Sequence, residues 1–219
     1  MTLDPGSTTE HNGRVVRFGP RAETGAVGKA TAIGAFQLTT LGRRRRAGTV
    51  IEIRNEIPDD VPAIRDVNER AFGGRAEAQV VDMLRAANKA VVSLVAQHGD
   101  RVVGHILFSP VSVTNAPQTF RAVGLAPMSV LPEFQKKGIG SRLVRDGLAA
   151  CQRAGYDMVV VLGHVDYYPR FGFSRAKDYG LENEYQALDA FMVLELKNGV
   201  LQTIGGLVQF APEFREAGC

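Results

Sequence analysis

The stretch that decides the fold runs from Val123 to Arg142 and reads V-G-L-A-P-M-S-V-L-P-E-F-Q-K-K-G-I-G-S-R. An apolar segment typical of a strand is followed by a break and then by a basic glycine loop that opens a helix. Gly138 and Gly140 let the main chain approach an anion without an intervening side chain. The unpaired N–H groups of the first helical turn and the positive end of the helix dipole then bind that anion. The stretch predicts a pyrophosphate site, although a Gly-x-Gly pair by itself is more often a plain glycine turn that opens a helix.

Donors and positive charge around this loop are supplied by side chains and main-chain amides at Gln135, Lys136, Lys137, Ile139, Ser141 and Arg142. The spacing excludes two commoner phosphate motifs. A Walker A loop carries its lysine after the glycines, whereas both lysines precede them here. A dinucleotide fingerprint needs a third glycine at the position of Leu143.

The Gln-x-x-Gly-x-Gly pattern formed by Gln135, Gly138 and Gly140 resembles the acetyl-coenzyme A (acetyl-CoA) signature of the GNAT N-acetyltransferases. The strand V-G-L-A-P-M-S-V before it, the segment Y-P-R-F-G-F and the tail G-G-L-V-Q-F are similar to the small bacterial YhbS-type branch of that family. The resemblance covers most of the chain and leaves out residues 1–48. It implies acetyl-CoA as co-substrate and an amine as acceptor.

Periodicity predicts the elements of an α/β fold in a recognisable order. The predicted strands are 50–54, 90–97, 101–113, 120–130, 157–162 and 191–197. The predicted helices begin at Ile57–Asp60, whose aspartates fall in the first turn, after Gly74, in the glycine loop and near 165–171. This order indicates a mixed central sheet with helices on both faces, as the GNAT acyltransferase fold also implies.

By the same resemblance, two parallel strands splay apart between 125–130 and 159–162. Pro127 supports a break there, because proline donates no hydrogen bond to a sheet. The resemblance further implies that the amides of Met128, Ser129 and Val130 hold the pantetheine arm and polarise the thioester carbonyl.

Acyl transfer to an amine needs an acid for the departing thiolate. Tyr168 is the first candidate, because it lies four residues before Gly172, where the resemblance places a tyrosine near the coenzyme A sulfur. A ring packed at a helix end is the alternative interpretation. On a helix the adjacent Tyr167 would point about 100° away from Tyr168, so the two hydroxyls cannot reach the same sulfur.

The base is less clearly marked, because segment 120–125 lacks the glutamate that many relatives carry there. His164 closes the strand beside the proposed splay and is a candidate to relay a proton near neutral pH. A structural hydrogen bond at the sheet end is the other interpretation. Glu69, Glu77 and His105 are weaker candidates, and water is a further proton acceptor.

With 219 residues, 45% hydrophobic content and a net charge of +3, the chain fits one globular domain with an appendage. Basic residues outnumber acidic ones in 1–48, whereas 49–219 is slightly acidic. We predict a disordered basic extension at 1–48 and a GNAT domain at 49–219. The extension is open to three explanations: an upstream start codon, a solvated tail, or a nucleic-acid or targeting arm.

Two cysteines, Cys151 and Cys219, make no disulfide framework, and Cys151 falls on an apolar helical stripe as a buried thiol would. No membrane span or secretory leader is recognisable, which favours the cytoplasm. No metal site is predicted.

The sequence favours an N-acetyltransferase that acts by direct attack, with a small-molecule or peptide amine as acceptor. A non-catalytic acyl-CoA sensor and nucleic-acid binding through the basic extension are the alternatives. The loop 71–76 is expected to border the acceptor, and Arg70 and Arg75 are placed to attract an acidic one. The acceptor itself is not defined, and a homodimer is compatible with the fold.

Overall fold

The computed structural model describes residues 50–114, 116 and 120–219. The prediction for the extension at 1–48 therefore lies outside the described residues. One sheet runs through the described domain, and its strands are β1 (Ile51–Asn55), β2 (Val92–His98), β3 (Arg101–Thr114), β4 (Ala122–Val130), β5 (Met158–Leu162), β6 (Ser174–Arg175), β7 (Leu181–Asn183), β8 (Phe191–Glu195) and β9 (Gly206–Gln209).

Hydrogen-bonded neighbours follow the order β1-β2-β3-β4-β5-β8-β6, and β9 pairs with the end of β3 and with β7. The β4–β5 and β7–β9 pairs are parallel, and the other pairs are antiparallel. The predicted mixed sheet is confirmed.

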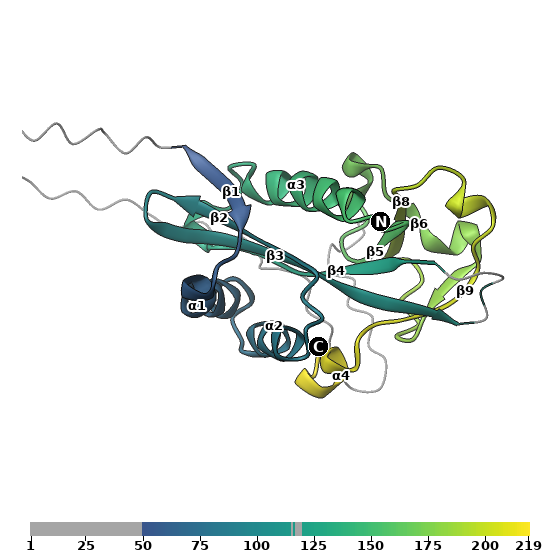
Figure 1. Cartoon of the computed structure of the whole chain (residues 1–219), viewed down its shortest axis with the longest axis horizontal. Helices are drawn as coiled ribbons and strands as arrows, with labels where there is room; N and C mark the ends of the chain where they lie inside the picture. The colour runs from purple at the N-terminus through teal and green to yellow at the C-terminus, as the bar shows by residue number, and fades with distance from the viewer. Residues whose placement is uncertain (1–49, 115, 117–119) are drawn as a thin grey trace, which may run out of the picture.

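The α-helices lie on both faces of this sheet (Figure 1). They are α1 (Val61–Phe72), α2 (Ala76–Ala86), α3 (Ile139–Arg153) and α4 (Pro212–Ala217). In Figure 1, α3 covers one face, whereas α1, α2 and α4 cover the other. The predicted break between the first two helices is real, because Gly73 ends α1 in the left-handed conformation at φ 70°.

Two predictions about the C-terminal third were wrong. The short helix expected at 165–171 is a single 3-10 turn, Tyr168–Phe171. The strand expected at 191–197 ends at Glu195, and β9, which periodicity did not predict, follows it. Strands of two to four residues such as β6, β7 and β9 are too short to show an alternating pattern, so periodicity cannot detect them.

Helix α3 packs closely on the sheet at a residue without a side chain. A Cβ built on Gly147 would lie 2.5 Å from Cε2 of Phe108, so this ring occupies the space that a side chain would take. On the same stripe Cys151 is fully buried, as predicted, and burial raises the pKa of its thiol to about 12. The buried face of α3, which contains Gly147 and Cys151, thus sets the distance and orientation of the helix relative to β3 and β4.

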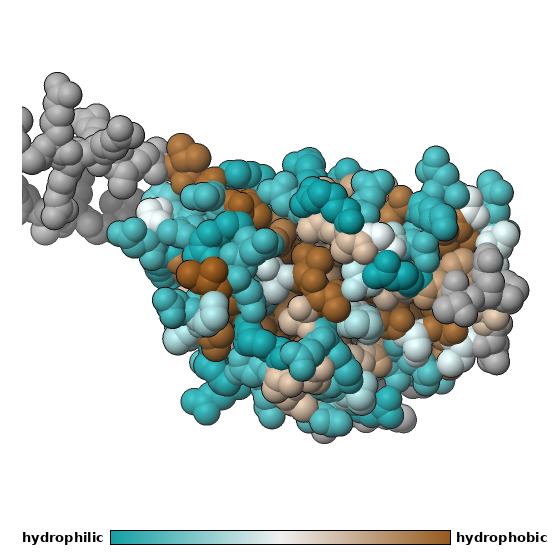
Figure 2. All heavy atoms as spheres, in the orientation of Figure 1, coloured by the Kyte–Doolittle hydropathy of each residue, from teal (hydrophilic) through white to brown (hydrophobic). Residues whose placement is uncertain are grey.

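On the face shown in Figure 2, apolar side chains form several separate patches among polar ones. No helix in the described ranges is long and apolar enough to cross a membrane. Within the same residues, no group of three or more His, Cys, Asp or Glu side chains is arranged to hold a metal ion.

Candidate active site

The parallel strands β4 and β5 are paired over only part of their length. The register joins Ala122 to Met158, Val123 to Val159 and Gly124 to Val160. Beyond Gly124, β4 continues to Val130 beside β3 alone, and its register with β3 shifts opposite the segment that contains Pro127. The two strands therefore separate in the region where the splay was predicted.

The opened edge of β4 presents main-chain amides. The Leu131 amide donates to the Val103 carbonyl of β3 at 2.9 Å, and His105 pairs with Ser129 in the same register. Because successive amides of a strand point to opposite sides, the amides of Met128 and Val130 face the opening. The Ser129 amide faces β3 instead. Of the three amides proposed to hold pantetheine, only those of Met128 and Val130 therefore face the opening between β4 and β5.

The glycine loop enters α3 through residues with positive φ. Lys136 has φ 59° and Gly138 has φ 78°, and the Arg142 amide donates to the Gly138 carbonyl at 3.1 Å to close the first turn. The amides of Ile139, Gly140 and Ser141 precede this bond and are the free donors of the helix N-terminus. A helix N-terminus with free amides is suited to an anion, and the anion site itself stays a prediction.

Three of the predicted loop side chains bind the protein's own main chain. Gln135 Nε2 donates to the Val130 carbonyl at 3.0 Å, which fastens the loop to the end of β4. Lys137 Nζ donates to the Glu133 carbonyl at 2.8 Å, and Arg142 donates to the Ile51 carbonyl at 2.7 Å. Lys136 is exposed and makes no such bond within the described residues. The side chains of Gln135, Lys137 and Arg142 thus shape the loop, while its amides stay available.

Gly140 lies at a tight corner between the N-terminus of α3, β4 and Tyr167. A Cβ built there would lie 3.1 Å from the Tyr167 hydroxyl and 3.5 Å from the Met128 sulfur, so glycine lets the helix start close to both side chains. The residues present fit the diphosphate of coenzyme A through the main-chain amides of the first turn of α3 and the exposed Lys136.

The two adjacent tyrosines occupy different environments. The Tyr167 ring is half-buried, and its hydroxyl points toward Gly140. Tyr168 is buried against Gly163, just beyond the end of β5, and its ring meets Phe173 at a centroid distance of 5.6 Å. Burial raises the pKa of Tyr168, and Tyr167 adds to this shift. Tyr168 therefore keeps its proton at physiological pH.

The candidate bases are spread over the domain. His164 is exposed in the segment that follows β5, and its carbonyl accepts a hydrogen bond from the Tyr167 amide at 3.0 Å. Glu69 on α1 is 3.5 Å from Arg65, and Glu77 lies in the first turn of α2. His164 and Tyr168 lie on the same segment after β5, whereas Glu69 and Glu77 lie on α1 and α2.

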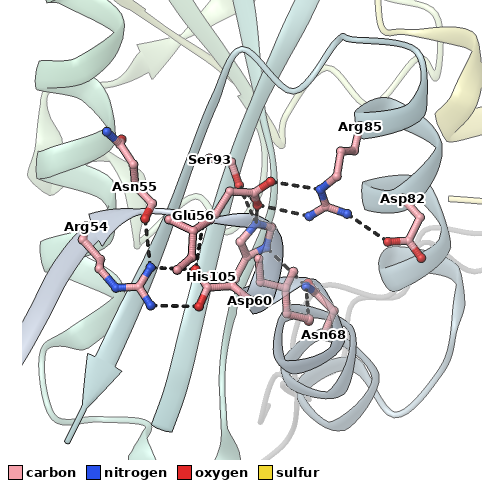
Figure 3. Close-up of polar contacts among 11 residues, drawn as sticks. Arg54, Asn55, Glu56, Asp60, Asn68, Asp82, Arg85, Ser93 and His105 are labelled. Atoms are coloured by element: carbon pink, nitrogen blue, oxygen red, sulfur yellow. Dashed lines mark hydrogen bonds and ion pairs between the residues drawn. The ribbon is translucent and has the colours of Figure 1, made fainter. Parts of the chain in front are cut away.

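His105 is fully buried, and both of its ring nitrogens are engaged (Figure 3). Its Nδ1 is 3.2 Å from Nδ2 of Asn68, which also donates to the Ile64 carbonyl. An amide nitrogen only donates, so Nδ1 is the acceptor and Nε2 carries the proton toward Ser93 Oγ at 2.9 Å. Because both nitrogens are occupied, His105 has no free position for a substrate proton.

The chain of hydrogen bonds ends at the carboxylate of Glu56. Glu56 accepts the Ser93 hydroxyl and a bidentate contact from Arg85 at 2.9 and 3.1 Å (Figure 3). Burial raises the pKa of Glu56, but His105 Nε2 at 3.7 Å and the hydrogen bonds from Arg85 and Ser93 outweigh it and lower the pKa overall. Burial lowers the pKa of His105, so the imidazole is neutral.

This network ties α1 and α2 to the sheet on the face opposite α3. His105 of this network lies on β3, directly opposite Ser129 of β4. The network is therefore separated from the opening between β4 and β5 by one strand. Ser129 Oγ is itself buried without a hydrogen-bond partner among the described residues. Sequence reasoning missed Glu56, Asn68 and Ser93 because no local spacing relates them.

Comparisons with known proteins agree with this geometry. The model of the acetyltransferase (GNAT) domain matches residues 52–176. The uncharacterized N-acetyltransferase YhbS of Escherichia coli strain K12 is 35% identical over 164 residues, which cover 74% of this chain and 97% of that protein. The uncharacterized N-acetyltransferase YjhQ of the same strain is 40% identical over 116 residues, 52% of this chain and 64% of that protein.

Two solved structures share the fold and hold the expected ligand class. Escherichia coli YhbS in complex with CoA superposes with a TM-score of 0.73 at 34% identity, over 77% of this chain and 93% of that chain. A GNAT family acetyltransferase from Brucella melitensis in complex with acetyl-CoA gives 0.63 at 37% identity, over 76% and 99%. With the splayed strands and the glycine loop in place, the chain belongs to the GNAT family of acetyltransferases.

Proposed function

We propose that this protein transfers an acetyl group from acetyl-CoA to a primary amine, by direct attack of the amine on the thioester. The observation that carries the proposal is the opening between β4 and β5, which begins where their pairing stops at Gly124 and Val160. The opening lies beside the free amides at the start of α3. Related proteins bind CoA and acetyl-CoA on the same fold, which supports the choice of co-substrate.

Acetyl-CoA would supply the activated acyl group. The amides of Ile139, Gly140 and Ser141 would hold its diphosphate, and the exposed Lys136 would add countercharge. The Met128 and Val130 amides would donate to the pantetheine arm or to the carbonyl oxygen, where a positioned donor stabilises developing negative charge. These donors are main-chain groups held by the sheet and the helix, so they need no rearrangement on binding.

Tyr168 is proposed as the acid that protonates the departing thiolate. It lies in the 3-10 turn that follows β5, with its ring against Gly163 just beyond that strand, and its raised pKa keeps the phenol protonated. We expect Tyr168→Phe to lower kcat by about 10²-fold, the usual contribution of a general acid, with little change in the KM for acetyl-CoA. Thiol release followed against time measures both constants.

The matched control is Tyr167→Phe, which removes the neighbouring hydroxyl. Because Tyr167 faces Gly140 at the diphosphate corner, this change should raise the KM for acetyl-CoA and spare kcat. The assignment is wrong if the kcat loss appears in Tyr167→Phe and not in Tyr168→Phe.

His164 is proposed as the base that accepts the amine proton, directly or through water, because it follows β5 on the same segment as Tyr168. We expect His164→Gln to lower kcat by about 10²-fold with little change in the KM for acetyl-CoA, because the variant loses the proton acceptor but not the CoA-binding amides. An unchanged kcat would assign proton removal to water alone.

The acceptor is a small-molecule or peptide amine. Arg70, one of the arginines expected to attract an acidic acceptor, is already paired with Glu133 at 3.1 Å and Asp66 at 3.4 Å, so its charge is balanced within the protein. A screen of amino acids, polyamines, aminoglycosides and peptide N-termini, scored by thiol release, tests the activity. CoA binding without release for any amine would favour the sensor instead.

A further inference from the structure

A hollow of about 280 Å³ lies between α3 and the strands β1 and β2, and the proposed acetyl transfer makes no use of it. Pockets for drug-sized ligands begin at about 300 Å³, so this one suits a more compact molecule. In the sheet order β1 is three strands from β4, about 14 Å at the usual strand spacing. The hollow is therefore separate from the opening between β4 and β5.

The floor of the hollow is apolar. Ile53 of β1 and Leu94 of β2 line it from the sheet, and Ala149 lines it from α3. Leu94 is buried, and the other two are half-buried. An aliphatic group of a few carbons placed on this floor leaves water, which stabilises its binding.

Two opposite charges lie above this floor on the α3 wall. Asp146 and Arg153 are seven residues apart, so they lie on the same side of the helix, about 10.5 Å apart along its axis. Both side chains are exposed, and neither forms an ion pair or a hydrogen bond with another described residue. The two charges thus line one hollow without pairing with each other, which leaves room for a ligand that carries both opposite charges.

The remaining polar groups of the lining add no further free charge. The Arg54 guanidinium donates to Asp60 at 2.6 and 2.8 Å and to Gln97 at 2.6 Å, so its charge is met within the protein (Figure 3). The Asn55 side chain is exposed and makes no hydrogen bond within the described ranges. Its amide can donate to a carboxylate or accept from an ammonium group.

We propose that this hollow binds a free amino acid with an aliphatic side chain. The ammonium group pairs with Asp146, the carboxylate takes the guanidinium fork of Arg153, and the side chain lies on Ile53 and Leu94. A guanidinium binds a carboxylate through two parallel hydrogen bonds, which favours arginine for this role. An acid or an amine of the same shape leaves one of the two protein charges without a partner. This inference goes beyond acetyl transfer and does not depend on it.

The test measures the dissociation constant of L-leucine by saturation-transfer NMR on the full chain, without acetyl-CoA. Two analogues serve as comparisons: 4-methylpentanoate lacks the ammonium group, and 3-methylbutan-1-amine lacks the carboxylate. We expect leucine to bind about tenfold more tightly than either, as hydrogen bonds to charged groups allow.

Variants then assign each charge to its partner. Asp146→Asn should weaken leucine about tenfold and leave 4-methylpentanoate unchanged, because that analogue has no ammonium group for Asp146. Arg153→Gln should weaken leucine to a similar extent and leave 3-methylbutan-1-amine unchanged. Because both positions are exposed, we expect the urea midpoints of the variants to equal that of the unmodified protein.

Asp100→Asn and Arg145→Gln are the matched controls, because they remove the same charges at exposed positions outside this hollow. Both should bind leucine as the unmodified protein does. No leucine binding, equal affinity for leucine and its analogues, or leucine binding that survives in both hollow variants would overturn the inference. The last result would also be expected if leucine occupied the acceptor site instead. Thiol release tests the proposed acetyl transfer separately, so neither result decides the other.

Discussion

At the scale of single residues, His105 changes its protonation between the folded and unfolded chain in mild acid. Burial lowers its pKa from the ordinary value of 6.5, an effect that Glu56 opposes and Arg85 reinforces. Below about pH 6.5 the unfolded chain therefore binds a proton here that the folded chain does not. The free energy of unfolding consequently falls as the pH falls and is fully retained above that pH.

We expect His105→Gln to weaken this dependence, because glutamine keeps an acceptor for Asn68 and a donor for Ser93 but does not titrate. Urea unfolding of both proteins between about pH 7 and pH 5 measures the effect. The pKa of Glu56 is also lowered, but from 4.5, so its contribution is lost at lower pH and does not mask the result. If the free energy of unfolding changed equally with pH in the two proteins, the role assigned to His105 would be contradicted.

At the scale of elements, α3 carries the anion site, and its position depends on the contact between Gly147 and Phe108. Gly147→Ala would improve helix propensity, yet its Cβ would lie 2.5 Å from a buried ring carbon. We expect overpacking to dominate and to lower the free energy of unfolding by about 1–3 kcal/mol. Denaturant titration of the variant measures this loss.

A second substitution separates overpacking from other causes. Phe108→Leu shortens the side chain that the new methyl group would strike, so Gly147→Ala should be less harmful in that background. We expect a coupling free energy of about 1 kcal/mol or more between the two sites. Additive losses would show that the helix and the sheet do not meet as closely as the structure places them.

At the scale of the whole molecule, ligand binding should stabilise the folded domain. At a concentration 100 times the dissociation constant, acetyl-CoA should add about 2.7 kcal/mol, which corresponds to a rise in Tm of about 5–10 °C. ATP and NAD should give much smaller shifts, because neither carries a pantetheine arm for the opening between β4 and β5. Comparable shifts with all three ligands would indicate general nucleotide binding.

Deletion of residues 1–48 should leave both acetyl-CoA binding and thiol release within about twofold of the full chain, because the family match begins at residue 52. If the extension binds nucleic acid, that binding should fall steeply with salt and disappear in the deletion. A loss of acetyl transfer in the deletion would instead make the extension part of the catalytic unit.

Local patterns predicted the large elements and the glycine turn that opens α3. Gln135, Gly138 and Gly140 lie within six consecutive residues, and such a loop takes its shape mainly from its own sequence. The splay was also predictable in position, since Pro127 cannot continue a sheet ladder. The shortest strands were missed, because two to four residues carry no period.

The sequence by itself determined the order of the elements, the break in β4 and the turn that frees the α3 amides, because each depends on backbone preferences of neighbouring residues. Only the tertiary structure decided that Tyr167 faces Gly140 while Tyr168 is buried, that His105 is fully engaged, and that Asn55 joins Asp146 and Arg153 in one hollow. Those facts depend on contacts between residues far apart in the chain, which form only when the helices pack on the sheet and which no local spacing records.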